Sequence, residues 1–359
     1  KYLKKDIRLM VSKSFFYESN NFKFLEKTKS SVIIYNKISH TKYEILDPDI
    51  PFLLNKQFDY KKIDNAPIIK NRTILITGAG GTIGGELLRQ CLNYFPAKLV
   101  ILDHDEFSIY QITNKFDSKS IHPIVGSITN LKLLNYLFKN FDFDYVFHCA
   151  AYKHVNLVQK NFYSAFYNNV IGTINIAKNV IKSKKTKLIF VSTDKAIIPS
   201  STMGASKRIC ELYLMSFYKK NNKVDNLRIV RFGNVIGSKG SFIPKLVDQI
   251  KNNQTITITH NKVQRYFMTV DQAVGLILSS INLNNYKESI FTFRMGKSIK
   301  IKTLVQKIIK YSGYYISLRD AKIIFSNLNS GEKLNEILFS NKKKYVETLN
   351  KDIFLEYQN

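Results

Sequence analysis

Tryptophan is absent from the 359-residue chain, and cysteine is scarce, with three residues. Cys91, Cys149 and Cys210 are far apart and odd in number, and each lies within an apolar pattern. This usage excludes a disulfide framework and lacks the spacing of a metal site. We therefore expect reduced core cysteines in a cytoplasmic protein that binds no metal.

Acidic residues are also few, at 27 against 55 lysines and arginines, which gives a formal net charge of +28. A charge of this size suggests a nucleic-acid partner. The lysines, however, are spread along the chain, which is rich throughout in Lys, Asn, Ile and Tyr, as is typical of AT-rich genomes. We expect no nucleic-acid partner. The charge would instead help to hold a polyanionic ligand or to approach an anionic membrane surface.

No apolar run reaches the length of a membrane span, and no signal peptide is visible. These absences predict a cytoplasmic protein. The chain begins at Lys1 rather than at a methionine. This leaves open an upstream region that associates with the cytoplasmic face of the inner membrane.

Strand-like and helix-like segments alternate between residues 73 and 233. Short apolar runs such as TILITG, KLVILD and KLIFVST are separated by helix-length segments such as GTIGGELLRQCLNYF. This rhythm predicts an α/β fold, a doubly wound parallel sheet of the NAD-binding Rossmann type. Because the chain is longer than one core usually is, we expect three parts. They are a lead-in of unknown role at 1–70, the Rossmann domain at 71–234, and a smaller, mainly substrate-binding lobe at 235–359.

A glycine-rich turn follows the first of these strands and opens the next helix. In TGAGGTIGG, Gly78, Gly81 and Gly84 are spaced G-x-x-G-x-x-G, which differs from the standard G-x-G-x-x-G dinucleotide fingerprint. Both spacings can bind a pyrophosphate for the same physical reasons. Glycine lets the backbone approach the pyrophosphate, and the start of the helix offers N–H groups and a positive dipole end. We assign these glycines, with Thr82 and Ile83, to cofactor binding. The alternative is a plain glycine-rich turn.

Asp103 ends the second strand, 19 residues beyond Gly84. A carboxylate at this position accepts hydrogen bonds from the adenosine ribose and repels a 2′-phosphate. NAD is therefore the expected cofactor rather than NADP. The alternative is that Asp103 or Asp105 caps the next helix. Ala150 and Ala151, after the fourth strand, are small enough to let the cofactor pass and are assigned to its binding.

Several strings of the sequence together resemble the extended short-chain dehydrogenases. They are the glycine-rich turn, HCAAYKHV, NNVIGT, STDKA, MGASKR, RFGNVIGS, QRYFMTVDQAV and SGEKLNEIL, and they span roughly residues 70–345. More narrowly, they resemble the polysaccharide-biosynthesis dehydratases, in particular the configuration-retaining UDP-N-acetylglucosamine 4,6-dehydratases. The resemblance implies an NAD-dependent lyase (a hydro-lyase). Its UDP-N-acetylhexosamine substrate, with UDP-GlcNAc favoured, would become a 4-keto-6-deoxy sugar for capsule, lipopolysaccharide or another surface glycan.

The same resemblance implies catalytic roles for two segments around the nicotinamide. In STDKA, Asp194 is the candidate acid for the C6 hydroxyl, and Lys195 is the candidate base at C5. In MGASKR, Met203 stands where most short-chain dehydrogenases have a tyrosine. Lys207, which holds the nicotinamide ribose in the family, follows one helical turn later on the same face. A thioether cannot transfer a proton, so the O4 proton falls to Thr193 or to a water near Met203 and Lys207.

The chemistry explains why these residue types are needed. A hydride leaves C4 for NAD⁺, and the resulting 4-keto group acidifies the C5 proton. A base then removes that proton while an acid protonates the departing 6-hydroxyl, and the stored hydride returns to C6. Asp194 must be protonated and Lys195 neutral before the elimination, which partial burial favours. The alternative is a solvated charged pair in a loop.

Asn234 and Arg265 match substrate-side positions of the family, and Lys153 is assigned to a contact with the sugar or phosphate. An arginine fork suits a diphosphate, although a surface ion pair is the alternative for Arg265. His148 and His154 are more simply explained as structural histidines than as catalytic ones.

Other family positions are structural or altered. Asn169 in NNVIGT matches a residue that orders the site through backbone hydrogen bonds. Ser127 replaces a usual aspartate after the third strand, which weakens an adenine contact. Asn329 replaces a usual arginine, which removes a contact to the nucleotide diphosphate.

Other functions remain compatible with the same fold. A UDP-sugar epimerase or a C5-inverting dehydratase would usually keep the tyrosine, so Met203 argues against both. A non-catalytic NAD-binding relict is favoured slightly by the lost arginine and opposed by the intact Asp194–Lys195 pair. Beyond a UDP-sugar substrate, we expect the partner to be a second copy of the chain in a homo-oligomer.

Overall fold

The structure is a computed structural model and describes residues 8–28, 30–38, 43–46, 49–54, 66–283, 289–312, 321–339 and 345–357. Contacts divide the chain into two compact units. The larger, which we call the sheet unit, comprises Phe58–Val235, Tyr266–Lys297 and Asn329–Asn359. The other, the split unit, comprises Lys1–Gln57, Ile236–Arg265 and Ser298–Leu328.

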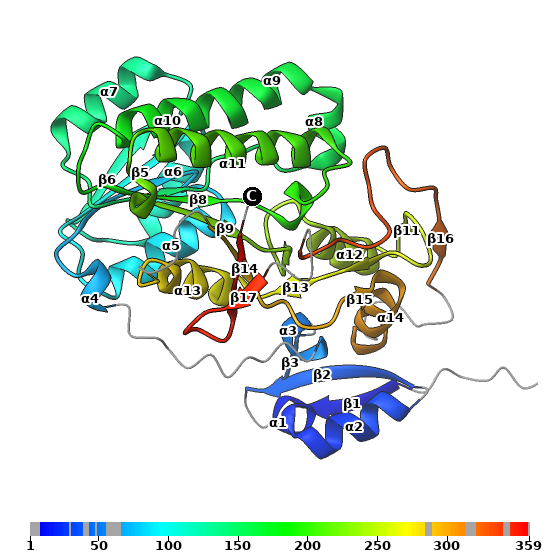
Figure 1. The fold of residues 1–359 in the computed structure, drawn as a ribbon. Coiled ribbons are helices and arrows are strands. Elements are labelled where there is room, and N and C mark those ends of the chain that lie inside the picture. Colours follow the sequence, from blue (N-terminus) through cyan, green and yellow to red (C-terminus); the bar gives the residue numbers. More distant parts are fainter. Residues whose placement is uncertain are drawn as a thin grey trace, which may run out of the picture. The chain divides into compact units, whose positions relative to one another are not determined.

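The sheet unit contains a nine-stranded sheet that confirms the predicted α/β fold (Figure 1). In spatial order its strands are β17 (Tyr345–Glu347), β18 (Ile353–Tyr357), β14 (Ser289–Phe293), β9 (Leu227–Arg231), β8 (Lys187–Val191), β7 (Tyr145–His148), β4 (Thr73–Thr77), β5 (Lys98–Asp103) and β6 (Ile121–Val125). Neighbours from β14 to β6 are parallel, whereas β18 pairs antiparallel with β14 and β17. The strand order reverses at β4, as in doubly wound sheets.

Helices cover both faces of this sheet (Figure 1). One layer holds α5 (Thr82–Leu92), α6 (Glu106–Lys115) and α13 (Val270–Ser280), and the other holds α7 (Leu131–Asn140), α10 (Gly172–Val180) and α11 (Thr202–Lys220). Along β4, Ile74 and Ile76 pack into the first layer and Leu75 into the second. Because successive side chains of a strand point to opposite faces, strands buried on both sides consist of continuous apolar runs.

Short elements complete the sheet unit between these strands and helices. They are α4 (Ala66–Ile69), α8 (Val155–Lys160), α9 (Phe162–Phe166), the π-helix η1 (Tyr167–Ile171), the 3₁₀ helices η2 (Asp194–Ala196) and η3 (Val224–Asn226), and the paired strands β10 (Asn234–Val235) and β13 (Phe267–Met268).

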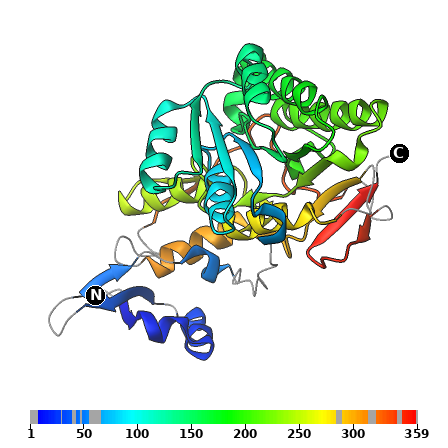
Figure 2. The same ribbon diagram turned by 90° about the vertical axis from the view of Figure 1, so that its left-hand side faces the viewer.

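The split unit begins with a small sheet in the order β1-β2-β3 (Figure 2). Its elements are β1 (Arg8–Ser12), α1 (Lys13–Tyr17), α2 (Ser19–Lys27), β2 (Ser31–Lys37), β3 (Tyr43–Leu46), α3 (Ile50–Leu53), α12 (Phe242–Lys251), β11 (Ile256–Ile258), β12 (Gln264–Arg265), β15 (Ile299–Lys300), α14 (Ile301–Tyr311) and β16 (Ile323–Phe325). The rings of Phe16 and Phe22 lie 5.4 and 5.6 Å from that of Tyr311 on α14. Lys307 on α14 also pairs with Glu26 at 2.6 Å. Contacts thus join the N-terminal residues to a helix far along the chain.

This division differs from the three consecutive segments expected at 1–70, 71–234 and 235–359. Residues 266–297 and 329–359 belong to the sheet unit, because β14 pairs in parallel with β9 and β18 pairs with β14. Residues 1–57, expected as a lead-in, share the split unit with 236–265 and 298–328.

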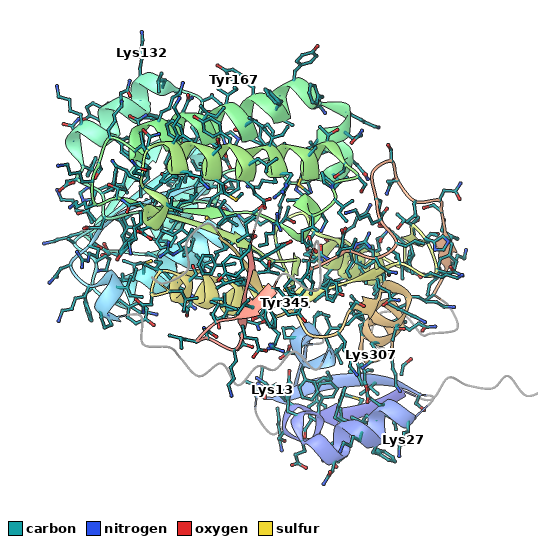
Figure 3. The ribbon with its side chains drawn as sticks, in the orientation of Figure 1. Lys13, Lys27, Lys132, Tyr167, Lys307 and Tyr345 are labelled. Carbon is teal, nitrogen blue, oxygen red and sulfur yellow. The ribbon has the colours of Figure 1, made fainter. Side chains whose placement is uncertain are left out.

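Lysines are distributed over both units. Lys13 and Lys27 come from α1 and α2 of the split unit, and Lys132 comes from α7 of the sheet unit (Figure 3). In the described part of the chain, no helix combines the length and the apolar character that a membrane crossing requires. No cluster of His, Cys, Asp or Glu suited to a metal ion occurs among the same residues.

Candidate active site

The glycine-rich turn between β4 and α5 approaches the segment that follows β7. Gly78 has a φ of +69°, and a Cβ there would lie 2.6 Å from the backbone nitrogen of Ala150. A Cβ on Gly84 would overlap the carbonyl oxygen of Gly78. Both positions therefore need glycine, the first for its backbone conformation and both for the close approach.

The start of α5 favours the binding of an anion at this turn. Gly81 is the N-cap residue, and Thr82 and Ile83 begin the first turn of this 11-residue helix. Backbone N–H groups in the first turn of a helix point toward the N-terminus, where the helix dipole favours negative charge. The turn therefore fits the pyrophosphate of a dinucleotide.

Asp103 is buried at the end of β5, and its carboxylate braces the same turn. Oδ2 accepts a hydrogen bond from the Gly80 N–H at 2.9 Å, and Oδ1 accepts one from the Asp105 N–H at 3.1 Å. Of the two aspartates considered as caps, Asp105 is the N-cap residue of α6. Asp103 is thus fixed beside the turn that would hold the cofactor.

The segment after β7 is held in place by Asn169 of η1. Ala150 and Ala151 are half-buried there. The Tyr152 N–H donates to Asn169 Oδ1 at 2.7 Å, and Asn169 Nδ2 donates to the Tyr152 carbonyl at 3.0 Å. These paired hydrogen bonds support the structural interpretation of Asn169.

His148 is buried at the end of β7 between two threonine hydroxyls. Its Nδ1 lies 2.7 Å from Thr77 Oγ1 and its Nε2 lies 2.9 Å from Thr173 Oγ1. Burial, with a smaller contribution from Lys207, lowers the pKa of His148 to about 3. The ring is therefore neutral near pH 7 and fully hydrogen-bonded, which supports a structural role. His154, by contrast, is exposed.

Met203 and Lys207 are buried one turn apart on α11. Met203 packs in an apolar cluster with Val158 and Ala165. Lys207 Nζ donates to the Val191 carbonyl at 2.7 Å, and burial lowers the pKa of this amine. The place of the usual tyrosine is thus filled by an apolar side chain, while the lysine is tied to the end of β8.

Thr193, Asp194 and Lys195 form a connected group at the carboxyl end of β8. Thr193 is the N-cap residue of η2, and its Oγ1 donates to Asp194 Oδ1 at 3.0 Å. Lys195 Nζ donates to the same oxygen at 3.0 Å. Asp194 is only 1% exposed, and its other oxygen, Oδ2, has no hydrogen-bond partner. Such a buried acceptor is costly unless something pairs with it, and this oxygen is unpaired in the structure.

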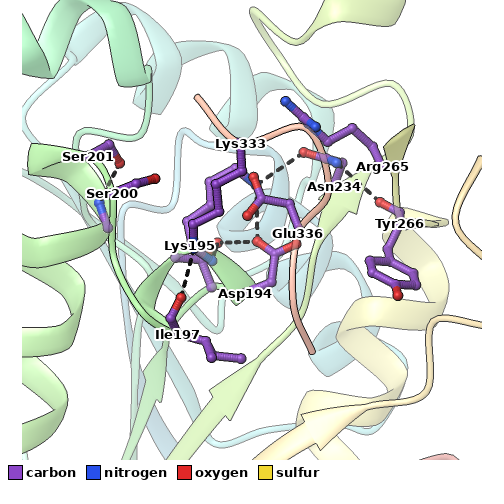
Figure 4. Close-up of polar contacts among 12 residues, drawn as sticks. Asp194, Lys195, Ile197, Ser200, Ser201, Asn234, Arg265, Tyr266, Lys333 and Glu336 are labelled. Atoms are coloured by element: carbon purple, nitrogen blue, oxygen red, sulfur yellow. Dashed lines mark hydrogen bonds and ion pairs between the residues drawn. The ribbon is translucent and has the colours of Figure 1, made fainter. Parts of the chain in front are cut away.

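Two further residues reach the Lys195 amine (Figure 4). Asn234 Oδ1 lies 3.4 Å from Lys195 Nζ, and the Asn234 Nδ2 donates to the Tyr266 carbonyl at 3.2 Å. Glu336 Oε1 lies 3.7 Å from Lys195 Nζ. Glu336 is buried, and its Oε2 also lacks a hydrogen-bond partner.

Glu336 was not predicted as a site residue. Its string, SGEKLNEIL, served only to extend the family resemblance. The string carries no local signal that singles out Glu336, whose side chain the structure shows to be buried. The segment is fixed where Lys333 Nζ donates to the Ile197 carbonyl at 2.8 Å and Ser200 Oγ donates to the Gly331 carbonyl at 2.9 Å.

The remaining predicted residues lie outside this group of contacts. Lys153 is exposed. Arg265 lies in β12 of the split unit, where its Nη1 donates to the Gln264 carbonyl at 2.8 Å. Ser127 Oγ lies 2.8 Å from Thr129 Oγ1, and the Asn329 side chain donates to Glu332 at 3.1 Å.

The parallel sheet, the glycine-rich turn and the polar group after β8 define the class of the protein. It has the extended short-chain dehydrogenase fold, and the candidate site lies at the carboxyl ends of the strands. The chain belongs to the family described as "Polysaccharide biosynthesis protein", which it matches over residues 74–358.

The proteins to which the chain is similar in sequence differ in the activities that their names give. The chain is 37% identical to the capsular polysaccharide biosynthesis protein CapD of Staphylococcus aureus, over 80% of this chain and 48% of CapD. It therefore spans about half the length of that relative. It is 28% identical to a UDP-N-acetylglucosamine 4,6-dehydratase (inverting) of Campylobacter jejuni, over 78% of this chain and 80% of the relative. It is 30% identical to a UDP-glucose 4-epimerase of Rickettsia bellii, over 76% and 79% of the two chains.

A solved structure supports the same fold. The X-ray structure of Pen from Bacillus thuringiensis is 30% identical to the chain and superposes with a TM-score of 0.73. The similarity covers 81% of this chain and 89% of Pen. The chain therefore shares its fold with polysaccharide-biosynthesis and nucleotide-sugar proteins, among which both dehydratases and epimerases occur.

Proposed function

We propose that the chain is an NAD-dependent 4,6-dehydratase of a UDP-N-acetylhexosamine, with UDP-GlcNAc as the favoured substrate. The observation that carries the proposal is the Asp194–Lys195 pair, in which Asp194 is buried and its Oδ2 lacks a hydrogen-bond partner, while Lys195 is partly exposed. An epimerase only moves a hydride to and from C4, whereas a dehydratase must also protonate a hydroxyl and remove a carbon-bound proton. A carboxylate–amine pair suits these two tasks.

The cofactor assignment rests on the fit of the glycine-rich turn. The cradle that a Cβ at Gly78 or Gly84 would fill, and the start of α5, would hold the pyrophosphate of NAD. Asp103 would accept hydrogen bonds from the adenosine ribose. Bound NAD would supply an acceptor for the C4 hydride and give the hydride back at C6.

Within the elimination, the chain's own residues move protons. Lys195, as the neutral amine, removes the C5 proton of the 4-keto sugar, and the electron pair passes to the carbonyl. Asp194, as the acid, protonates O6 while the C6–O6 bond breaks and water leaves. The 3.0 Å contact between Lys195 Nζ and Asp194 Oδ1 provides a path by which the amine can give its proton to the carboxylate beforehand.

The first step also needs an acceptor for the O4 proton. Met203 cannot serve, because a thioether does not transfer protons. Thr193 is one candidate, since its hydroxyl is hydrogen-bonded to Asp194 Oδ1. A water near Met203 and Lys207 is the other.

The second candidate is a UDP-sugar 4-epimerase, favoured by the 30% identity to the Rickettsia bellii enzyme. Incubation with UDP-GlcNAc, followed by nuclear magnetic resonance of the product, separates the two. We expect a 4-keto-6-deoxy sugar from the wild type. Met203→Tyr should not raise this turnover, because a bulkier ring would crowd the buried Met203 pocket. A wild type that yields only 4-epimerised sugar, or an inactive wild type that tyrosine restores, would contradict the dehydratase proposal.

Cofactor choice gives an independent prediction. Titration calorimetry should show that NAD binds about tenfold or more tightly than NADP, because the Asp103 carboxylate binds ribose hydroxyls and repels a 2′-phosphate. Asp103→Asn keeps the size of the side chain and should narrow this difference. The exposed Asp117→Asn is the matched control and should keep it. Tighter binding of NADP by the wild type would remove Asp103 from cofactor recognition.

A further inference from the structure

Glu336 has a buried carboxylate that the proposed chemistry leaves unexplained. Its side chain is 4% exposed, and Oε1 lies 3.7 Å from Lys195 Nζ. Its other oxygen has no hydrogen-bond partner. Burying a carboxylate is costly unless a positive group compensates it, and the Lys195 amine is the positive group that it contacts.

The two carboxylates are not equivalent. Asp194 shares Oδ1 with both Thr193 and Lys195, and its backbone N–H is fixed to the Phe232 carbonyl at 3.1 Å. Glu336 contacts Lys195 through Oε1 at a longer distance and comes from the segment tied down by Lys333. One amine therefore lies between an acid that must give a proton away and a second carboxylate with no such task.

We propose that Glu336 is a positioning residue for Lys195, which it holds and whose positive charge it balances when Asp194 is protonated. The inference rests on the proposed function. The elimination requires a proton on Asp194 and a neutral Lys195, with the Glu336 carboxylate beside the amine. When the C5–H bond breaks, the proton forms a new N–H bond on Lys195, and the electron pair moves into the sugar carbonyl.

The ionised Glu336 stabilises the ammonium group that forms in this step. Asp194 then gives its proton to O6, the C6–O6 bond breaks, and water leaves. Without Glu336, the ammonium would form beside a protonated Asp194 and without the carboxylate that lies 3.7 Å from it. Glu336 thus makes Lys195 a stronger base at the moment when that base is used.

The charged groups near Lys195 indicate which of them can change the basicity of its amine. Asp194 on η2 and Glu336 on the C-terminal segment contact the amine. The Lys207 amine on α11 binds the Val191 carbonyl, and the Lys333 amine binds the Ile197 carbonyl. Asn234, from β10, adds a neutral oxygen at 3.4 Å. Removing the Glu336 charge should therefore change the protonation of Lys195 directly.

The test compares Glu336→Gln with Glu332→Gln in the full 359-residue chain. Glutamine keeps the shape of glutamate and loses its charge, and Glu332 lies in the same segment, bonded to Asn329. In Glu336→Gln we expect kcat for UDP-GlcNAc to fall about 10- to 100-fold with little change in KM. The acid limb of its pH–rate profile should also move to lower pH, because an amine without its anionic neighbour loses its proton more easily.

A second measurement does not depend on the sugar reaction. Competitive labelling with acetic anhydride, read by mass spectrometry, reports the neutral fraction of Lys195 as the pH changes. The midpoint should be lower in Glu336→Gln than in wild type and Glu332→Gln, and Glu336→Asp, which keeps the charge, should restore it. An unchanged midpoint would overturn the inference, whatever the enzyme makes. A shifted midpoint would support the pairing of Glu336 with Lys195. If the wild type then made no 4-keto sugar, only the proposed dehydratase activity would be contradicted.

Discussion

Lys195→Ala should lower the turnover of UDP-GlcNAc to the 4-keto-6-deoxy sugar by about 10³-fold or more, because the group that removes the C5 proton is lost. The chain should still fold, since the Lys195 side chain is 19% exposed and fills no apolar core position, but its melting temperature should fall because Asp194 and Glu336 lose the cation that they contact. NAD binding should stay near the wild-type value, because the cofactor is assigned to the glycine-rich turn. Steady-state kinetics, calorimetry with NAD and thermal melting measure these three properties.

The matched control is Lys132→Ala, which removes an exposed lysine from α7 (Figure 3). It should keep both turnover and the melting temperature. Near-normal ketosugar formation by Lys195→Ala would remove Lys195 from the mechanism. A normal rate of hydride transfer to NAD⁺ with no elimination would instead confirm its place at the C5 step, because oxidation at C4 precedes that step.

The central strands of the fold could be predicted because each is a short apolar run between helix-length segments. Strands β4, β5, β7, β8 and β9 are buried on both faces, and this burial alone produces the pattern. The return of β14 to the side of β9 could not be predicted. Its run, SIFTF, lies beyond several short elements, and pairing between segments distant in the chain leaves no local periodicity.

Some residues of the candidate site could likewise be predicted from the sequence, and others could not. Asp194 and Lys195 directly follow a predicted strand, so the rule that parallel sheets bind ligands at their carboxyl ends placed them. Glu336 belongs to a segment without regular secondary structure, and only its contact with Lys195 identifies it. The tie between Lys207 and the Val191 carbonyl was likewise hidden, because the sequence does not determine where a long side chain points.

A buried ion cluster beside this site should dominate the stability of the sheet unit. Arg231 on β9 is 1% exposed and lies between Glu211 of α11 and Glu356 of β18. Its Nε donates to Glu211 Oε1 at 2.7 Å, and its Nη1 donates to Glu356 Oε2 at 2.7 Å. Both glutamates are fully buried. The guanidinium thus joins a central strand, a helix and the last strand, and Ser192, next to Thr193, also donates to Glu211 at 2.6 Å.

Arg231→Met should lower the free energy of unfolding by about 3–5 kcal/mol, because it removes the buried cation that two buried carboxylates share, and Glu211 keeps only the part-exposed Arg208, at 3.1 Å, as a cationic partner. Urea unfolding followed by circular dichroism measures the loss. Glu356→Gln in the same chain should recover part of the lost unfolding free energy, because it removes one of the two buried negative charges. The control is Arg294→Met, whose pairing with Glu347 is 44% and 65% exposed and should be worth no more than about 1 kcal/mol. Equal losses of unfolding free energy in Arg231→Met and Arg294→Met would show that burial does not determine how much the Arg231 cluster stabilises the protein.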